Sequence, residues 1–137
     1  MNAVPASVPS GLQTFLALDF GLKRTGVAVG NRLLQTAQPQ GTIAAQGEAR
    51  WVKIAQHIKE WQPDALVLGV PFHPDGAIHE NTLRARRFGR QMQARFGLPV
   101  FEVDERYSTT DALAAGARDV DAAAACIILE QFLRSLP

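Results

Sequence analysis

The stretch FLALDFGLKRTGVAVG, residues 15–30, decides the fold that we expect for this chain. It begins with an apolar run that no polar residue interrupts, which predicts a β-strand covered on both faces. Asp19 follows where that strand leaves the core, and a lone carboxylate there needs water, a cation or hydrogen-bond donors. Two glycines permit a tight return into a second apolar strand, and Lys23 and Arg24 stand at the tip of the turn. The pattern therefore predicts a hairpin with an acid at its edge and cations at its tip.

The composition is that of one globular domain. With 137 residues, of which 47% are apolar and 20% charged, the chain is long enough for a single sizeable core. We expect residues 1–13 to form a flexible tail and residues 14–137 to form the domain. The tail has neither the basic start nor the apolar run of a signal peptide, and no stretch is long enough to cross a membrane. A cytoplasmic location is the default expectation. The single cysteine, Cys126, lies in an apolar run and is expected to be buried.

The rest of the chain alternates between strand and helix patterns. After the hairpin, the expected elements are a strand at residues 33–37, a helix at 47–61, a strand at 65–70, a helix at 82–96, a strand at 100–104, a brief helix at 111–115 and a final helix at about 119–135. Gln-Pro-Gln-Gly at 38–41 should break the third strand, which Thr42 and Ile43 could continue, and Asn81 is the expected N-cap of the second helix. This order predicts an α/β fold with a mixed five-stranded sheet. Its first three strands would be antiparallel and its last two parallel, with helices on both faces.

Two acids near the strand at 100–104 have different side-chain parity. Glu105 has the parity of Phe101 and Val103, the more apolar face, where an acid is unexpected. Asp104 has the opposite parity and is more easily explained as a solvated residue at the strand end or as a partner of Arg106. Glu105 is therefore the stronger candidate for a functional site.

Asp121 is a third candidate acid. It lies at helical spacing before Ala125, Ile128 and Phe132, so it heads the apolar stripe that must face the core. An acid in the first turn can also simply complement the helix dipole, but Asp119 serves that role equally well. If Asp121 faces inward, its carboxylate is better explained as the ligand or partner of a bound cation.

The three acids are expected to converge, because ligands in open α/β sheets gather outside the carboxyl ends of the parallel strands. Asp19 and Glu105 lie at strand ends, and Asp121 opens the following helix. Three carboxylates repel one another without a cation, and an all-oxygen site suits Mg²⁺ or Mn²⁺. Two such ions about 3.5–4 Å apart can stabilise the attacking and leaving oxygens of phosphodiester cleavage.

Other constellations are weaker. His73, Asp75 and His79 share a loop, but nothing completes a zinc-binding set, so they are interpreted as surface residues. The glycines of the first hairpin lack the Walker spacing, and no serine or cysteine has the context of a nucleophile.

Arginine dominates the positive charge. Eleven of the fourteen cations are arginine, although the formal net charge is only +1. Five arginines occupy the arc of the helix at 82–96 that its apolar stripe leaves open. Such an arc is usually a solvated face, but with little acidic compensation it also suits phosphate. The candidate nucleic-acid-binding residues are Lys23, Arg24, Arg84, Arg87, Arg90 and Arg106.

Four motifs in order resemble the YqgF family, the Holliday junction resolvase-like or pre-16S rRNA nucleases. They are LDFGLKRTGVAVG at residues 18–30, LVLGVPFHPDG at 66–76, VDERYSTTDA at 103–112 and VDAAAACIILEQFL at 120–133. The match spans about residues 15–133. The first motif alone also resembles the phosphate-binding hairpin of actin-like ATPases. Compared with several relatives, the chain looks short at residues 112–120.

The resemblance implies a ribonuclease H-like fold in which Asp19, Glu105 and Asp121 are both the catalytic residues and the metal ligands. It also implies a cytoplasmic role in ribosome biogenesis, with cleavage of the 5′ end of pre-16S rRNA as the activity. The expected partner is nucleic acid, namely structured RNA or, alternatively, branched DNA, and no membrane is expected. The choice between a monomer and a homodimer stays open.

Alternatives to an RNA-processing nuclease stay open. Within the nuclease class, the chain could be a DNA endonuclease like the Holliday junction resolvases. An RNA- or transcription-associated module would keep the fold without catalysis, and its salt-dependent RNA binding would survive Asp19→Asn. An actin-like phosphotransferase lobe would use the Asp-x-Gly hairpin for ATP phosphates, but that fold needs two lobes and 137 residues supply one.

Overall fold

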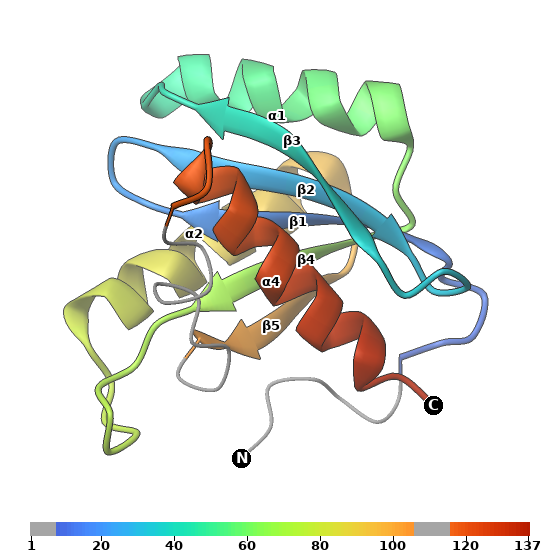
Figure 1. The fold of residues 1–137 in the computed structure, drawn as a ribbon. Coiled ribbons are helices and arrows are strands. Elements are labelled where there is room, and N and C mark those ends of the chain that lie inside the picture. The colour runs from blue at the N-terminus through green and yellow to red at the C-terminus, as the bar shows by residue number, and fades with distance from the viewer. Residues whose placement is uncertain (1–7, 106–115) are drawn as a thin grey trace.

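The structure is a computed structural model of the 137-residue chain and describes residues 8–105 and 116–137. In chain order, the described elements are β1 (Thr14–Phe20), β2 (Thr25–Asn31), β3 (Ala37–Ile43), α1 (Gly47–Trp61), β4 (Ala65–Val70), α2 (Glu80–Phe96), β5 (Val100–Asp104) and α4 (Val120–Arg134) (Figure 1). The brief helix expected at residues 111–115 lies outside the described residues. None of the described helices is long and apolar enough to cross a membrane.

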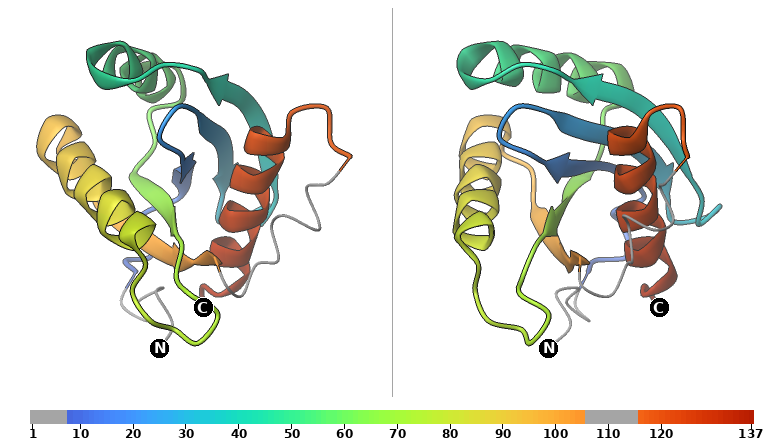
Figure 2. Two further views of the ribbon diagram at one scale, coloured as in Figure 1. Left: turned by 90° about the vertical axis from the view of Figure 1, so that its left-hand side faces the viewer. Right: turned by 60° about the vertical axis from the view of Figure 1, so that its left-hand side comes forward.

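One mixed sheet of five strands forms the centre of the molecule, in the order β3-β2-β1-β4-β5. The pairs β1–β2 and β2–β3 are antiparallel, and the pairs β1–β4 and β4–β5 are parallel. Figure 2 shows α4 on one face of the sheet and α1 and α2 on the other. The predicted α/β sheet, antiparallel at first and then parallel with helices on both faces, is therefore confirmed.

Each face of the sheet has its own apolar cluster, and β1 contributes to both. Phe15 and Ala17 belong to the cluster under α4, whereas Leu16 and Leu18 belong to the cluster under α1 and α2. All four are fully buried, as the uninterrupted apolar run predicts. Because side chains alternate along a strand, Asp19 shares the α4 face with Phe15 and Ala17.

The third strand lies later in the chain than the pattern predicts. It includes Pro39, whereas Leu33 lies in the preceding turn and is 85% exposed. Proline is tolerated here because β3 is an edge strand and its pairing with β2 contains an irregularity typical of a β-bulge. The predicted strand at 33–37 and the predicted break at 38–41 are therefore wrong.

The helices and parallel strands end close to the predicted residues, with one difference at α2. The bounds of α1, β4 and β5 are those expected, but α2 begins at Glu80 and its N-cap is His79. The His79 Nδ1 atom accepts a hydrogen bond from the Asn81 N–H at 2.9 Å, and the Thr82 hydroxyl accepts one from the His79 N–H at 2.9 Å. The predicted N-cap role of Asn81 is wrong, because the histidine ring supplies the acceptor two residues earlier and Asn81 is already helical.

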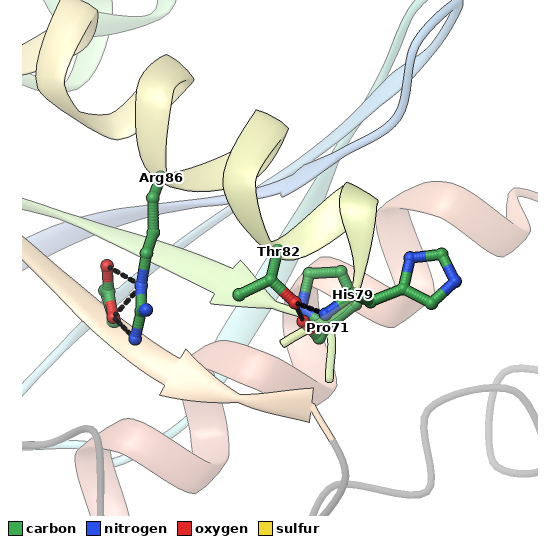
Figure 3. A network of polar contacts seen from close by, with 5 residues as sticks. Pro71, His79, Thr82 and Arg86 are labelled. Carbon is green, nitrogen blue, oxygen red and sulfur yellow. Dashed lines mark hydrogen bonds and ion pairs between the residues drawn. The ribbon is translucent and has the colours of Figure 1, made fainter. Parts of the chain in front are cut away.

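Thr82 joins the start of α2 to the end of β4. Its side chain is fully buried, and its hydroxyl donates to the Pro71 carbonyl oxygen while accepting from the His79 N–H (Figure 3). One turn later, Arg86 forms an ion pair with Glu102 of β5, with Nε and Oε2 3.2 Å apart. These contacts hold α2 against the end of β4 and the middle of β5.

Residues 8–13, which fall in the segment expected to be a tail, pack against the rest of the chain. Val8 is 6% exposed and joins the apolar cluster under α4. Arg32 donates to the Pro9 carbonyl oxygen at 3.0 Å, and Asp64 accepts from two backbone N–H groups at the start of β1. Those two bonds hold the pKa of Asp64 below its usual range. The described core therefore extends to Val8.

Replacing Thr82 with valine is expected to lower the free energy of unfolding by about 1–3 kcal/mol, because the half-buried Pro71 carbonyl and His79 N–H both lose their partner. Equilibrium denaturation in urea would measure the change. The exposed Thr36→Val variant is the control and should shift stability by no more than about 0.5 kcal/mol. Equal stability of the two variants would show that the Thr82 network contributes nothing.

Candidate functional site

Asp19 lies near the end of β1 between two glycines in the register of the sheet. Its partner in β2 is Gly26, and its partner in β4 is Gly69. Paired residues in a sheet share a face, so all three belong to the face that α4 covers. Because glycines flank Asp19, the space on both sides is open to residues from other elements.

Glu105, directly after β5, reaches the space beside Gly69. A Cβ atom at Gly69 would lie 2.6 Å from Oε1 of Glu105 and 2.5 Å from Cδ1 of Ile128 in α4. Glu105 therefore lies on the α4 face, as its parity with Val103 predicts. The missing side chain at Gly69 is what lets this half-buried carboxylate lie beside β4, one strand away from Asp19.

Asp121 is held beside Gly26 by the close approach of α4 to β2. A Cβ atom at Gly26 would lie 1.9 Å from the Asp121 carbonyl oxygen, a distance that no side chain could adopt without moving the helix. Asp119, the N-cap of α4, accepts hydrogen bonds from the Ala122 N–H at 3.0 Å and from the Thr42 hydroxyl at 2.6 Å. The start of α4 is thus fixed against both β2 and β3.

The structure brings the three predicted acids to one face and one end of the sheet, but it does not place them as a ready-made metal cluster. Among residues 8–105 and 116–137, no group of three or more His, Cys, Asp or Glu side chains is arranged to hold a metal ion. Instead, Oδ2 of Asp121 lies 3.1 Å from Nε of Arg24. Arg24 comes from the β1–β2 turn, so a cation expected to face phosphate contacts one of the acids.

Hydrogen bonds at the start of α4 stabilise the charged form of Asp119. The Thr42 hydroxyl is the largest cause that holds the pKa of Asp119 below its usual range, followed by the Ala122 N–H, with a smaller effect from Arg24. Asp119 therefore performs the capping role that the sequence assigned to it, which leaves the Asp121 carboxylate outside the cap.

Asp104 is buried, with an exposure of 5%, so its interpretation as a solvated strand-end residue is wrong. It pairs in register with Val70 of β4, on the face that α2 covers. Its parity, opposite to that of Glu105, turns the side chain toward that covered face. Arg106, its other expected partner and a candidate nucleic-acid-binding residue, lies outside the described residues. Parity gave the direction of Asp104, but nothing in the sequence indicated that the strand end would be covered there.

The arginines of α2 divide into paired and exposed groups. Among the described residues, the ion pairs of these arginines are Arg84–Glu80 at 2.8 Å, Arg86–Glu102 at 3.2 Å and Arg95–Glu48 at 2.9 Å. Arg87 and Arg90 are exposed, and no ion pair to either is found in the described parts of the chain. The acidic compensation is therefore larger than the sequence suggested, because two of the acids come from other elements. Lys23 is exposed in the β1–β2 turn.

A hollow opens at the end of the sheet beside the acids. Its volume is about 320 Å³, and its lining includes Phe20, Leu22, Pro71 and Glu105. We call it the Glu105 hollow. It gives a ligand access to Glu105 at the carboxyl ends of β1 and β4, where ligands bind in open α/β sheets.

Two other groups do not extend the site. The rings of His73 and His79 lie 4.6 Å apart, but His79 caps α2, and the described residues offer no metal-binding group that includes them. Cys126 is half-buried in α4, and burial raises the pKa of its thiol to about 11. The thiol is therefore neutral at physiological pH.

The chain is similar in sequence to known proteins. The family model "RuvX: Holliday junction resolvase" matches residues 13–135. A protein of Albidiferax ferrireducens named "Putative pre-16S rRNA nuclease" is 80% identical over 132 residues, which cover 96% of this chain and 85% of that protein. A protein of Polaromonas sp. with the same name is 73% identical over 137 residues, which cover 100% of this chain and 99% of that protein.

The fold is similar to that of RuvC from Thermus thermophilus. The structure of that protein in complex with a Holliday junction substrate matches with a TM-score of 0.56 and 13% sequence identity, covering 88% of this chain and 93% of that chain. A second RuvC structure gives a TM-score of 0.50 at 11% identity, with 84% and 92% covered. At such low sequence identity, the similarity is evidence about the fold alone. It confirms the predicted ribonuclease H-like architecture.

Replacing Gly69 with alanine is expected to displace the Glu105 carboxylate and to destabilise the fold by about 1–3 kcal/mol, because the added methyl would overlap Glu105 and Ile128. Urea denaturation and a crystal structure of the variant would measure both effects. Gly11→Ala is the matched control, since a Cβ atom there meets nothing within 4 Å. An unmoved Glu105 in a variant as stable as the control would contradict the packing described for Gly69.

Asp119 is expected to make the fold sensitive to acid. Because its pKa in the folded chain is depressed, its stabilising effect is complete above the ordinary value of 3.8 and is lost as the pH falls through the folded value. Thr42→Val removes the largest cause of the depression, so the variant should be less stable near neutral pH, and its smaller pH-dependent loss should be complete at a higher pH. Thermal unfolding of both proteins between about pH 2 and 7 would test this. A stability difference that is the same at every pH would contradict the linkage.

Proposed function

Since this chain belongs to the RuvX family of Holliday junction resolvases, we propose that it is a nuclease that hydrolyses phosphodiester bonds. Its proposed catalytic residues are Asp19, Glu105 and Asp121. The observation that carries the site is the register of the sheet. Asp19 lies between two glycines, and the missing side chains leave room for the Glu105 carboxylate on one side and the backbone of Asp121 on the other. Three acids from separate elements thus share one face and one end of the sheet, which the packing of the apolar core does not require.

The proposed cofactor is Mg²⁺ or Mn²⁺, and the three carboxylates fit it by their chemistry, since both ions prefer oxygen ligands. Asp19, Glu105 and Asp121 would hold it. Asp121 would first have to turn away from Arg24, because their ion pair engages Oδ2. When bound, such ions stabilise the attacking and leaving oxygens of an in-line displacement.

The exposed cations would position the nucleic-acid backbone. Arg24 is paired with Asp121 but is 67% exposed, so a phosphate can reach its guanidinium group. Lys23 lies next to it, and Arg87 and Arg90 are exposed on α2. Arg84 belongs to the same set, because its exposed pair with Glu80 is worth only about 0–1 kcal/mol. Phosphate contacts of this kind position a strand without reading its bases, and Arg106 is proposed for the same role.

The proposed substrate is structured RNA, with the 5′ end of pre-16S rRNA as the specific target. The relatives that are 80% and 73% identical carry the name of that activity, and a cytoplasmic role in ribosome biogenesis would follow. Branched DNA is the second candidate, supported by the name of the family model. A four-way junction has two-fold symmetry and would favour a homodimer, whereas an RNA end requires a single copy.

Cleavage of a pre-16S rRNA fragment and of a four-way DNA junction, each with Mn²⁺ or Mg²⁺, tests the proposal. The variants Asp19→Asn, Glu105→Gln and Asp121→Asn should each lower the cleavage rate by about 100-fold or more, because each removes part of a charge stabilisation worth several kcal/mol. Glu60→Gln, an exposed acid of α1, is the matched control and should cleave like the wild type.

The outcome separates the proposal from its alternatives. If neither substrate is cleaved, or if Asp19→Asn keeps full activity, the nuclease assignment is wrong. Salt-dependent RNA binding that persists in Asp19→Asn without any cleavage would identify a binding module instead. Preference for the DNA junction over the RNA fragment would overturn the proposed substrate while keeping the reaction.

A further inference from the structure

Arg50, near the start of α1, is a buried arginine that no acid neutralises among the described residues. It is 6% exposed, and the ion pairs found in the described parts of the chain do not include it. Burial lowers the pKa of its guanidinium. A buried charge without an opposite charge costs free energy unless the group is well hydrogen-bonded. The core does not require a cation at this position, so the reason for burying one lies in its contacts.

The Arg50 guanidinium joins several parts of the chain. Its Nε donates to the Ala45 carbonyl oxygen at 3.0 Å, and its Nη2 donates to the Leu22 carbonyl oxygen in the β1–β2 turn. Its central carbon lies 5.0 Å from the ring centroid of Phe20 and 5.7 Å from that of Phe88. Because the guanidinium is buried, little water competes for its hydrogen bonds, which strengthens them. Arg50 therefore ties the β1–β2 turn to α1 and α2.

The backbone of the β1–β2 turn, residues 21–24, depends on this contact. The ladder between β1 and β2 ends at the pair Phe20–Thr25. In the described chain, the backbone hydrogen bonds outside helices and strands do not involve residues 21–24. Among the described residues, the bond from Arg50 is the hydrogen bond that anchors the backbone of this turn to a distant element. Figure 1 shows the start of α1, which carries Arg50, above the turn.

The turn carries two cations, Lys23 and Arg24, and both are exposed. On its α4 side, Nε of Arg24 lies 3.1 Å from Oδ2 of Asp121. On its α1 side, the Leu22 carbonyl is held by the buried guanidinium, and Leu22 also lines the Glu105 hollow. A shift of the turn backbone would therefore move both cations relative to the hollow and to the start of α4.

We propose that Arg50 is a positioning residue that holds the β1–β2 turn in place for nucleic acid. Through the Leu22 carbonyl, it keeps Lys23 and Arg24 directed at the phosphate of the bound strand. A turn that is ordered before binding loses less conformational entropy when the phosphate arrives. This inference rests on the proposed nuclease function and extends it to α1, a helix that otherwise contributes no residue to the proposed site.

Backbone dynamics of the free wild type test whether the turn is held. If Arg50 anchors it, the amide order parameters of Leu22, Lys23 and Arg24 should match those of β1 and β2, at about 0.85. The NMR measurement needs no variant, so it decides the point even if a variant of Arg50 does not fold. Order parameters clearly below those of the two strands would overturn the proposal.

Arg50→Met tests whether the held turn matters for binding. Methionine can pack on the rings of Phe20 and Phe88, and replacing a buried charge by an apolar side chain of similar size often leaves stability unchanged. Binding is measured in EDTA with a pre-16S rRNA fragment and with a four-way DNA junction. For the ligand that the wild type prefers, Arg50→Met should weaken binding about tenfold. It should also reduce the slope of log affinity against log salt concentration by about 1–2, since Lys23 and Arg24 lose their phosphate contacts.

Arg32→Met is the matched control. Arg32 also donates to a backbone carbonyl oxygen, that of Pro9 at 3.0 Å, but it follows β2 at the opposite end of the sheet. The two variants lose the same charge, so Arg32→Met should bind nucleic acid like the wild type. An equal loss of affinity in both variants would show that net charge alone is responsible and would overturn the proposal.

A double-mutant cycle separates positioning from a role in stability alone and from a direct phosphate contact of Arg50. The combined variant Lys23→Gln and Arg24→Gln removes the cations of the turn. In that background, Arg50→Met should change the affinity by less than about twofold, because it acts through those two residues. A loss of affinity as large as in the wild-type background would overturn the proposal.

These measurements need neither metal nor cleavage, so they separate the role of Arg50 from the nuclease assignment. If the wild type cleaves nothing but the coupling between Arg50 and the turn is found, the nuclease function fails and the positioning role in binding stands. If the wild type cleaves and Arg50→Met binds and cleaves like it, the positioning role fails alone.

Discussion

The close approach of α4 to the sheet at Gly26 and Gly69 is the constraint on which the rest of the proposed site depends. A side chain at Gly26 would collide with the backbone of Asp121, and one at Gly69 would collide with Glu105 and α4. Two glycines at one level of a sheet remove apolar contact, and here the helix backbone and a carboxylate fill that space. The three acids share a face because the strands on both sides of Asp19 have no side chain at its level.

The alternation of a β-strand places two different environments next to each other at the end of β1. Asp19 faces α4 and the acids, whereas the next residue, Phe20, has the opposite parity and packs with the cluster under α1 and α2. The Glu105 hollow reaches around this strand end, because both Phe20 and Glu105 line it. One step along the backbone therefore separates the carboxylates from the apolar cluster under α1 and α2. The proposed cleavage site uses the face of β1 that α4 covers.

The two acids at the start of α4 are compensated in different ways. Asp119 is stabilised by fixed hydrogen bonds from Thr42 and a backbone N–H, so it belongs to the frame of the fold. Asp121 is compensated by Arg24, whose side chain is mostly exposed. An exposed ion pair contributes little to stability, so a phosphate or a cation can replace either partner at small cost. The frame and the proposed chemistry thus rest on different acids of the same helix turn.

The sequence by itself determined the elements whose signal is local. Apolar runs and helical spacing located β4, β5 and α1, and parity with Val103 gave the direction of Glu105. Prediction from the sequence failed where the deciding contact joins residues that are far apart in the chain. The edge strand β3 has no apolar pattern, because its side chains from Ala37 to Thr42 are half-buried or exposed in the described fold. The burial of Asp104 depends on what covers the strand end, and the pairing of Arg24 with Asp121 joins a turn to a helix nearly one hundred residues later. Periodicity records which way a side chain points, whereas only the packed fold decides which charge it meets.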